Sequence, residues 1–190
     1  MPGAMLASVV GYWLRKYIDK VKDKKNILAL IGNAFAGRQP PDSFFEKESY
    51  LESEYPVEAH NEILSIRDMH WSDISCELLD RYYDIDIWLS SEAFIYYLPG
   101  ILTAGIKQDN HNLLVYSHII GNLDRMPVPE YWDDYFLRRW PLLTIKELEA
   151  VEEWVFWIKQ RDAINYYPNT FDRVYATLTL LKKRQMRNGS

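Results

Sequence analysis

Histidine and closely spaced acidic side chains are the groups in this chain with the chemistry to bind a metal ion. His111 and His118 are seven residues apart, so on one helix they lie roughly 10 Å apart, too far to hold a single ion. Asp84 and Asp86 have a spacing that some metal–nucleotide sites use, but their side chains diverge in an extended segment. The sequence therefore predicts no metal site and no cofactor.

Proton transfer and nucleophilic catalysis have weak signals as well. His60 with Glu62, and His70 near Asp68, have the composition of general acid–base pairs, although surface histidines beside acids look the same in a sequence. Cys76 shares a predicted helix face with apolar residues, and no concentration of positive charge near it would activate the thiol. The chain also lacks a glycine-rich phosphate loop and a Gly-x-Ser-x-Gly sequence. We therefore predict no catalytic residues.

Aromatic side chains accompanied by acids are the more informative feature. The chain has 7 Trp and 14 Tyr among 190 residues, and we expect that one small core cannot hold them all. Trp and Tyr are enriched as interface anchors, so the excess favours a protein-binding surface, with ordinary core packing as the alternative for each residue alone. The predicted partner-binding residues are Glu46, Glu48, Glu52, Asp84, Asp86, Trp88, Trp132 and Trp157.

The net charge of −5 is distributed unevenly along the chain. Residues 15–25 and 182–187 are basic, whereas residues 42–62 carry seven acids against Lys47. An acidic body of this kind repels nucleic acid and attracts a basic protein, so we expect a basic protein partner and no nucleic acid. A solvated surface without a partner is the alternative.

The element that must position these residues is a helix over residues 88–106. Its apolar side chains recur at helical spacing and predict one buried face, with Ser90 or Ser91 as the N-cap. Pro99 interrupts the pattern, because a proline in a helix interior removes a backbone hydrogen bond. Either the helix is kinked or two helices meet at a corner, and we favour the kink. The residues of the face are Phe94, Tyr97, Leu98, Ile101, Leu102 and Gly105.

The remaining chain also has helical periodicity, and Thr144 with Glu147 has the spacing of a capping box at a helix start. Residues 24–26 are expected to break the chain between two helices, and residues 84–89 to be irregular. The fold class predicted is all-α, a single compact domain of about eight helices around the Pro-kinked helix, spanning residues 1–190. The other helices are expected over residues 6–22, 27–35, 43–53, 57–66, 73–83, 111–123, part of 130–140, 143–161 and from 169 onward.

Cysteine content and hydropathy limit the compartment. A single cysteine excludes an intramolecular disulfide, and no apolar run approaches the ~20 residues that a membrane span needs. The short apolar patch near the N-terminus precedes its positive charges, the reverse of a signal peptide. We expect a cytoplasmic protein without a membrane span.

Three motifs resemble an uncharacterised bacterial domain family, a domain of unknown function. They are Ile31-x-x-Ala34-Phe35 followed by Gly37 and Pro40, then Leu89-Ser90-x-Glu92-Ala93-Phe94-x-Tyr96-Tyr97-Leu98-Pro99, and finally Leu143-Thr144-x-x-Glu147. The resemblance covers residues 27–182, so residues 6–22 form an additional N-terminal helix, and Ser91 stands where the family often has proline. The resemblance implies no known activity, cofactor or site residue. Some small domains of this type accompany bacterial toxins as immunity proteins.

These observations favour a non-enzymatic protein-binding module, specifically an immunity protein that occludes a bacterial toxin. One alternative is a small hydrolase-like enzyme with a pocket beside Pro99, in which His70 or His118 acts with nearby carboxylates. A second alternative is a structural homo-oligomer, such as a homodimer, whose basic termini contact the acidic body of a neighbouring copy.

Overall fold

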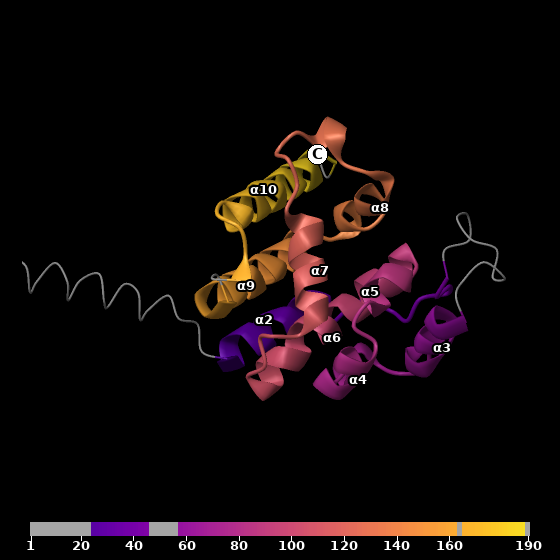
Figure 1. The fold of residues 1–190 in the computed structure, drawn as a ribbon. Helices are drawn as coiled ribbons and strands as arrows, with labels where there is room; N and C mark the ends of the chain where they lie inside the picture. Colours follow the sequence, from indigo (N-terminus) through magenta and orange to yellow (C-terminus); the bar gives the residue numbers. More distant parts are fainter. Residues whose placement is uncertain (1–23, 46–56, 163–164, 189–190) are drawn as a thin grey trace, which may run out of the picture.

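Helix α6 (Ser91–Gln108) is the centre of the arrangement in the computed structural model, which describes residues 24–45, 57–162 and 165–188. Every residue from Ala93 to Ile106 is buried, so the helix is covered on all sides and not only on the face that its periodicity predicts. Helices α2 (Lys24–Phe35) and α4 (Cys76–Arg81) pack on it, together with the 3₁₀ helix η2 (Trp71–Asp73). Figure 1 shows this arrangement.

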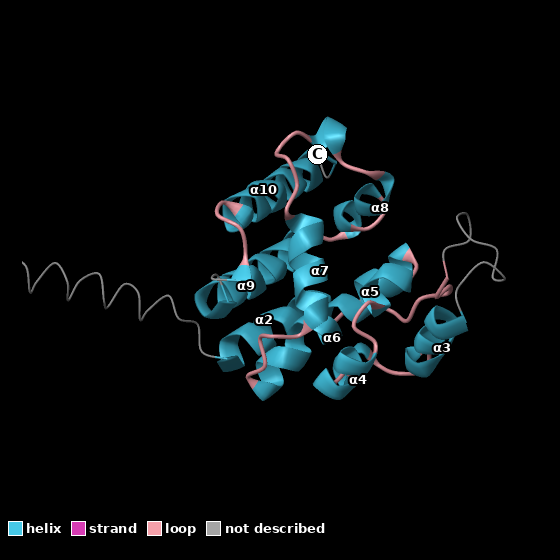
Figure 2. Cartoon of the chain, viewed as in Figure 1, coloured by secondary structure: helices cyan, strands magenta, loops and turns pink. Residues whose placement is uncertain are grey.

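A second group of helices lies beside this centre. Helices α9 (Ile145–Asp162) and α10 (Thr170–Asn188) lie side by side, α2 contacts α9, and α7 (Leu114–Leu123) contacts α10 (Figure 1). The short helices are α3 (Val57–Ile66), α5 (Ile85–Trp88) and α8 (Asp134–Leu137), with 3₁₀ turns η3 (Pro129–Tyr131) and η4 (Trp140–Leu142). The described residues contain nine α-helices and no strand, which confirms the all-α prediction (Figure 2).

Helix α6 continues through Pro99 as one helix, so two helices do not meet at a corner there. Ser90 is its N-cap, and the Ser90 hydroxyl oxygen accepts a hydrogen bond from the Ala93 N–H at 3.1 Å. The helix ends at Asp109, which adopts a left-handed conformation with φ of 56° and donates its N–H to Gly105 and Ile106. Both termini of the helix therefore have partners for their otherwise unpaired backbone groups.

Two glycines allow neighbouring segments to approach α6 closely. A Cβ atom at Gly100 would lie 2.1 Å from the Trp71 carbonyl oxygen, and one at Gly105 would lie 2.1 Å from the Asn110 carbonyl oxygen. The Gly105 N–H instead donates a hydrogen bond of 2.8 Å to the Tyr116 hydroxyl. The second half of α6 therefore contacts η2 at Gly100 and α7 at Gly105.

The capping box at the start of α9 is confirmed. The Thr144 N–H donates to the Glu147 carboxylate at 2.7 Å, and the Glu147 N–H donates to the Thr144 hydroxyl at 3.3 Å. Glu147 is nevertheless buried, whereas the capping residue of an isolated helix would be exposed.

Several expected boundaries were wrong. Residues 24–26 belong to α2 and do not break it, and residues 85–88 form a helical turn where we expected an irregular segment. The helix expected over residues 73–83 begins only at Cys76, with Ser75 as its N-cap, because residues 71–73 already form a 3₁₀ turn that His70 caps. Residues 130–140 divide between η3 and α8. The helix expected at 6–22 and most of the one expected at 43–53 lie outside the described residues.

Candidate functional site

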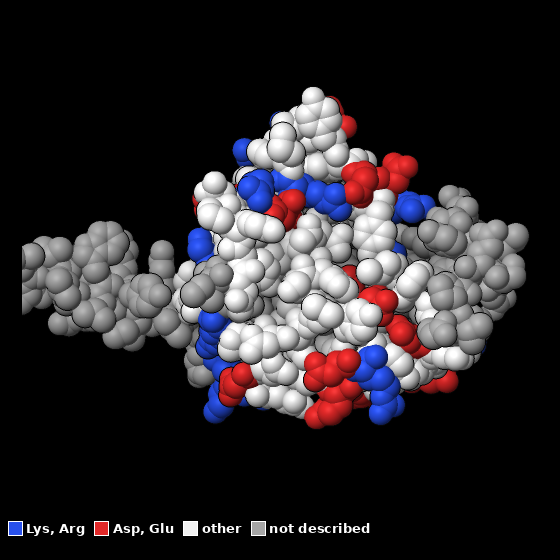
Figure 3. Space-filling view, viewed as in Figure 1, with Lys and Arg blue, Asp and Glu red and all other residues white. Residues whose placement is uncertain are grey.

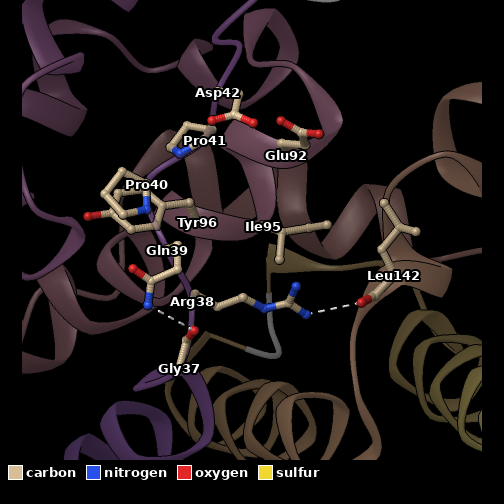
Figure 4. A pocket seen from close by; sticks show the side chains of 10 residues that line it. All are labelled: Gly37, Arg38, Gln39, Pro40, Pro41, Asp42, Glu92, Ile95, Tyr96 and Leu142. Atoms are coloured by element: carbon tan, nitrogen blue, oxygen red, sulfur yellow. Dashed lines mark hydrogen bonds between the residues drawn. The ribbon is translucent and has the colours of Figure 1, made fainter.

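A pocket of about 490 Å³ opens between the segment that follows α2 and the first turns of α6. Figure 4 shows the lining residues, which come from three parts of the chain: residues 37–42, the α6 residues Glu92, Ile95 and Tyr96, and Leu142 of η4. These parts are about 50 residues or more apart in sequence, so tertiary packing alone forms the pocket.

The segment over residues 37–45 is held against α6 at one side of the pocket. The Ser90 hydroxyl donates to the Ser43 carbonyl oxygen at 2.6 Å, and the Ser90 N–H donates to the Phe44 carbonyl oxygen at 2.9 Å. Between α2 and these bonds, Pro40 and Pro41 restrict the backbone to extended conformations. Ser90 therefore both begins α6 and fixes one wall of the pocket.

Arg38 is the positively charged residue in the lining, and its charge is already compensated. Its guanidinium makes a two-point contact with the Glu147 carboxylate, with both N–O distances at 2.5 Å. The Arg38 Nη2 atom also donates to the Leu142 carbonyl oxygen at 3.0 Å. A carboxylate as buried as that of Glu147 needs such a partner, because an unpaired buried charge is costly.

The carboxylates of Asp42 and Glu92 set the charge that the pocket presents to solvent. Both side chains are exposed, and neither makes an ion pair with another described residue. In Figure 4 both carboxylates lie on the same side of the pocket, beside Pro41. Because Arg38 is neutralised by Glu147, these two acids make the pocket negative.

The remaining lining is apolar or aromatic. Tyr96 and Ile95 are buried in α6 and line the pocket, and the rings of Tyr96 and Pro40 overlap in the view of Figure 4. An aliphatic stem with a cationic end matches this combination, since lysine and arginine side chains place their stems on apolar surface while the charged group stays near water or a carboxylate. The pocket can therefore accept a basic side chain.

The predicted partner-binding residues lie elsewhere, and three of them are buried. Asp86 has no exposed surface, Trp132 is 6% exposed and Trp157 is 2% exposed, so their assignment to a binding surface was wrong. The core holds many of the aromatic residues, Trp140 and Trp154 among them, but not all, because Tyr83, Tyr131 and Tyr167 are exposed, as we expected of some aromatic side chains.

The other predicted residues keep partial access to solvent or are outside the described residues. Trp88 on α5 and Asp84, which directly precedes α5, are half-buried, and the Trp88 indole N–H donates to the Asp84 carboxylate at 3.2 Å. They do not line the pocket of Figure 4. Glu46, Glu48 and Glu52, and the side chain of His60, lie outside the described residues.

An ion pair between the buried Asp86 and the half-buried His118 connects α5 to α7. The Asp86 Oδ1 atom lies 3.1 Å from His118 Nδ1, and Asp86 Oδ2 has no hydrogen-bond partner among the described residues. Burial raises the pKa of Asp86, and the hydrogen bond to Asp86 raises the pKa of His118. The Tyr135 hydroxyl donates to the Asp86 carbonyl oxygen at 3.3 Å. The Asp86 carboxylate orients the His118 imidazole, as an acid does beside a histidine that acts as a general base. Neither residue lines the pocket of Figure 4.

The other candidate residues have structural roles. The His70 Nδ1 atom accepts a hydrogen bond from the Ser72 N–H at 3.2 Å, and the His70 ring packs against Trp71 and Tyr96. Cys76 is buried, and burial raises the pKa of its thiol. The described residues contain no group of three metal-ligating side chains.

The sequence contained one usable signal for the pocket. Asp42 follows two prolines and Glu92 occupies the first turn of the central helix, where a carboxylate also faces the positive end of the helix dipole. The sequence shows that both residues are acids but gives no indication that they lie close together.

Among the described residues, no helix combines the length and apolar composition that crossing a bilayer requires.

Comparison with family models, curated proteins and solved structures finds no match to this chain. The resemblance to a bacterial domain of unknown function therefore stays a prediction.

Proposed function

We propose that this protein is a non-enzymatic protein-binding module that receives a basic side chain of its partner in the pocket between residues 37–42 and α6. The observation that carries this proposal is the pairing of Arg38 with Glu147, which leaves Asp42 and Glu92 as the uncompensated charges of the lining. Complementary charge of this kind speeds association and favours one class of partner over another.

The specific form of the proposal is an immunity protein, in which occlusion by the acidic surface neutralises a basic bacterial toxin. Support comes from the negative pocket and from the acid-rich composition of residues 42–62. Occlusion requires no catalytic group in the immunity protein, only a surface that covers the toxin site.

The test is protection of growing bacteria against the product of the neighbouring gene. The Asp42→Asn/Glu92→Gln double variant removes two negative charges at the pocket, and the Asp80→Asn/Glu149→Gln control removes two exposed charges elsewhere. We expect wild type and control to restore growth and the pocket variant to fail. A non-toxic neighbouring product, or equal protection by both variants, would contradict the proposal.

Direct binding gives a second readout. Purified wild-type protein and the control should bind the same toxin with equal affinity in calorimetry, and the pocket variant should bind about tenfold or more weakly at low salt. Raising the ionic strength should reduce this difference, because screening weakens exposed charge interactions.

The alternative function is a small hydrolase-like enzyme, and the observation that favours it is the Asp86–His118 pair. This pair lies between α5 and α7, whereas the segment packed on α6 at Gly100, next to Pro99, is η2. Hydrolysis of simple esters or phosphoesters by wild type, abolished in His118→Gln, would support the enzyme over the binding module.

A further inference from the structure

A second pocket, of about 390 Å³, has the opposite charge and lies between α10 and η3. Four of its residues, Leu180, Lys183, Arg184 and Arg187, are spaced at i, i+3, i+4 and i+7, so they form one continuous face of α10. Pro129, Glu130 and Trp132 form the opposite wall. We call this site the α10 groove.

Packing holds both walls of the α10 groove. The Trp132 indole N–H donates to the Met126 carbonyl oxygen at 2.9 Å, and its ring packs against Phe136 with centroids 4.9 Å apart. On α10, Lys182 pairs with Glu152 of α9 at 2.8 Å, and the Gln185 side chain donates to the Pro141 carbonyl oxygen. Both walls of the α10 groove are therefore fixed by contacts with the rest of the fold.

The cations of the α10 groove differ from the other cations near it. Arg125 pairs with Asp133, and Arg173 pairs with Asp124, so both are compensated within the fold. Lys183, Arg184 and Arg187 are exposed and make no ion pair with a described residue. Figure 3 shows Lys and Arg side chains over the α10 region in the upper part of the molecule.

Two exposed apolar or aromatic side chains are next in sequence to residues of the α10 groove, although neither lines it. Met186 is 57% exposed, and it is followed directly by Arg187. Tyr131, which is 74% exposed, stands between the lining residues Glu130 and Trp132. The apolar part of the groove lining itself is formed by Pro129, Trp132 and Leu180, so a ligand that carries acidic and apolar groups together matches the groove better than a simple anion does.

We propose that the α10 groove binds an acidic segment of a partner protein, with carboxylates on the three cations and an apolar side chain against Leu180 and Trp132. A nucleic acid matches it less well, because Glu130 lies in the lining and the whole chain has a net charge of −5. The proposal is independent of the negative pocket, which lies on other elements and takes the opposite charge.

The test uses a fluorescein-labelled peptide of alternating Glu-Glu-Leu-Phe units and measures its anisotropy with the full chain. Arg184→Gln/Arg187→Gln removes two groove cations, and Arg81→Gln/Lys146→Gln removes two exposed cations elsewhere. We expect the groove variant to weaken binding about tenfold and the control to leave it unchanged, since two partly exposed ion pairs are lost. Indole NMR signals of labelled tryptophan should place Trp132 at the contact.

Three further probes test whether another kind of ligand binds the α10 groove. The same peptide with Gln in place of Glu should not bind, and a single-stranded oligonucleotide and vesicles with anionic lipid should bind more weakly than the acidic peptide. Tighter binding of the oligonucleotide or the vesicles through Arg184 and Arg187 would overturn the proposal, as would equal affinity of the two double variants. Salt-sensitive self-association in ultracentrifugation that requires the same arginines would assign the groove to a second copy instead.

Discussion

The Glu147 carboxylate, which caps α9, lies 2.5 Å from the Arg38 Nε atom that follows α2, although the two residues are 109 positions apart in sequence. One carboxylate therefore begins a helix, neutralises the pocket arginine and connects the segment after α2 to α9. Its burial makes the pair sensitive to loss of either partner.

Replacing Arg38 with Met should lower the free energy of unfolding by about 3 kcal/mol, because Glu147 would remain buried and charged without its partner. Urea unfolding followed by circular dichroism measures this change. Thr144→Ala removes only the cap hydroxyl and should cost about 1 kcal/mol. Equal losses in the two variants would show that Arg38 contributes no more than a helix cap does.

Gly100→Ala should destabilise the fold by about 2 kcal/mol, because the new Cβ would lie 2.1 Å from the backbone oxygen of Trp71 and η2 would have to move. Gly121 in α7 is the matched control, since a Cβ there meets nothing within 4 Å. Gly121→Ala should stabilise by about 0.5–1 kcal/mol through helix propensity. Melting temperatures that shift in the same direction for both variants would contradict the close approach at Gly100.

Stability should fall as the pH rises above about 6.5, the ordinary pKa of histidine. The hydrogen bond to Asp86 raises the pKa of His118, so the folded state binds the proton more tightly than the unfolded state. The stabilisation is therefore complete below the unfolded pKa and is lost as the pH rises through the folded pKa. Burial raises the pKa of Asp86 as well, so this carboxyl also contributes stability that is lost as the pH rises.

Urea unfolding between pH 5.5 and 9 tests this dependence, with His118→Gln as the variant that should lose the decline above pH 6.5. His111→Gln is the control, because it leaves the Asp86–His118 pair intact and should keep the decline. A steeper fall in stability for His118→Gln than for wild type would reverse the sign of the argument.

Ser90→Ala should weaken both the fold and the pocket. It removes the hydroxyl that accepts from Ala93 and donates to Ser43, a loss of about 2 kcal/mol in total. Ser75→Ala removes the corresponding cap of α4 and should cost about 1 kcal/mol without affecting partner binding. If both serine variants bind the partner equally, the Ser90 contact does not position the pocket wall.

Local patterns predicted those features that depend on residues within one or two helical turns. The apolar spacing of residues 94–105, the Ser90 cap and the Thr144–Glu147 capping box are all present, because each is formed by neighbours along a single helix. Short segments were predicted poorly. Ser72 and Ser75 could each cap a helix that follows them. Ser75 caps α4, and Ser72 lies within η2, which packs on Gly100.

The sequence by itself determined an all-α protein with a long central helix and a surplus of acids around residues 42–62. Only the tertiary structure decided which charged and aromatic residues face solvent: Asp86, Trp132 and Trp157 are buried, whereas Asp42 and Glu92 share a pocket. The physical reason is that burial of a polar group depends on a partner from another element, as His118 is for Asp86. Spacing along one helix carries no information about that partner.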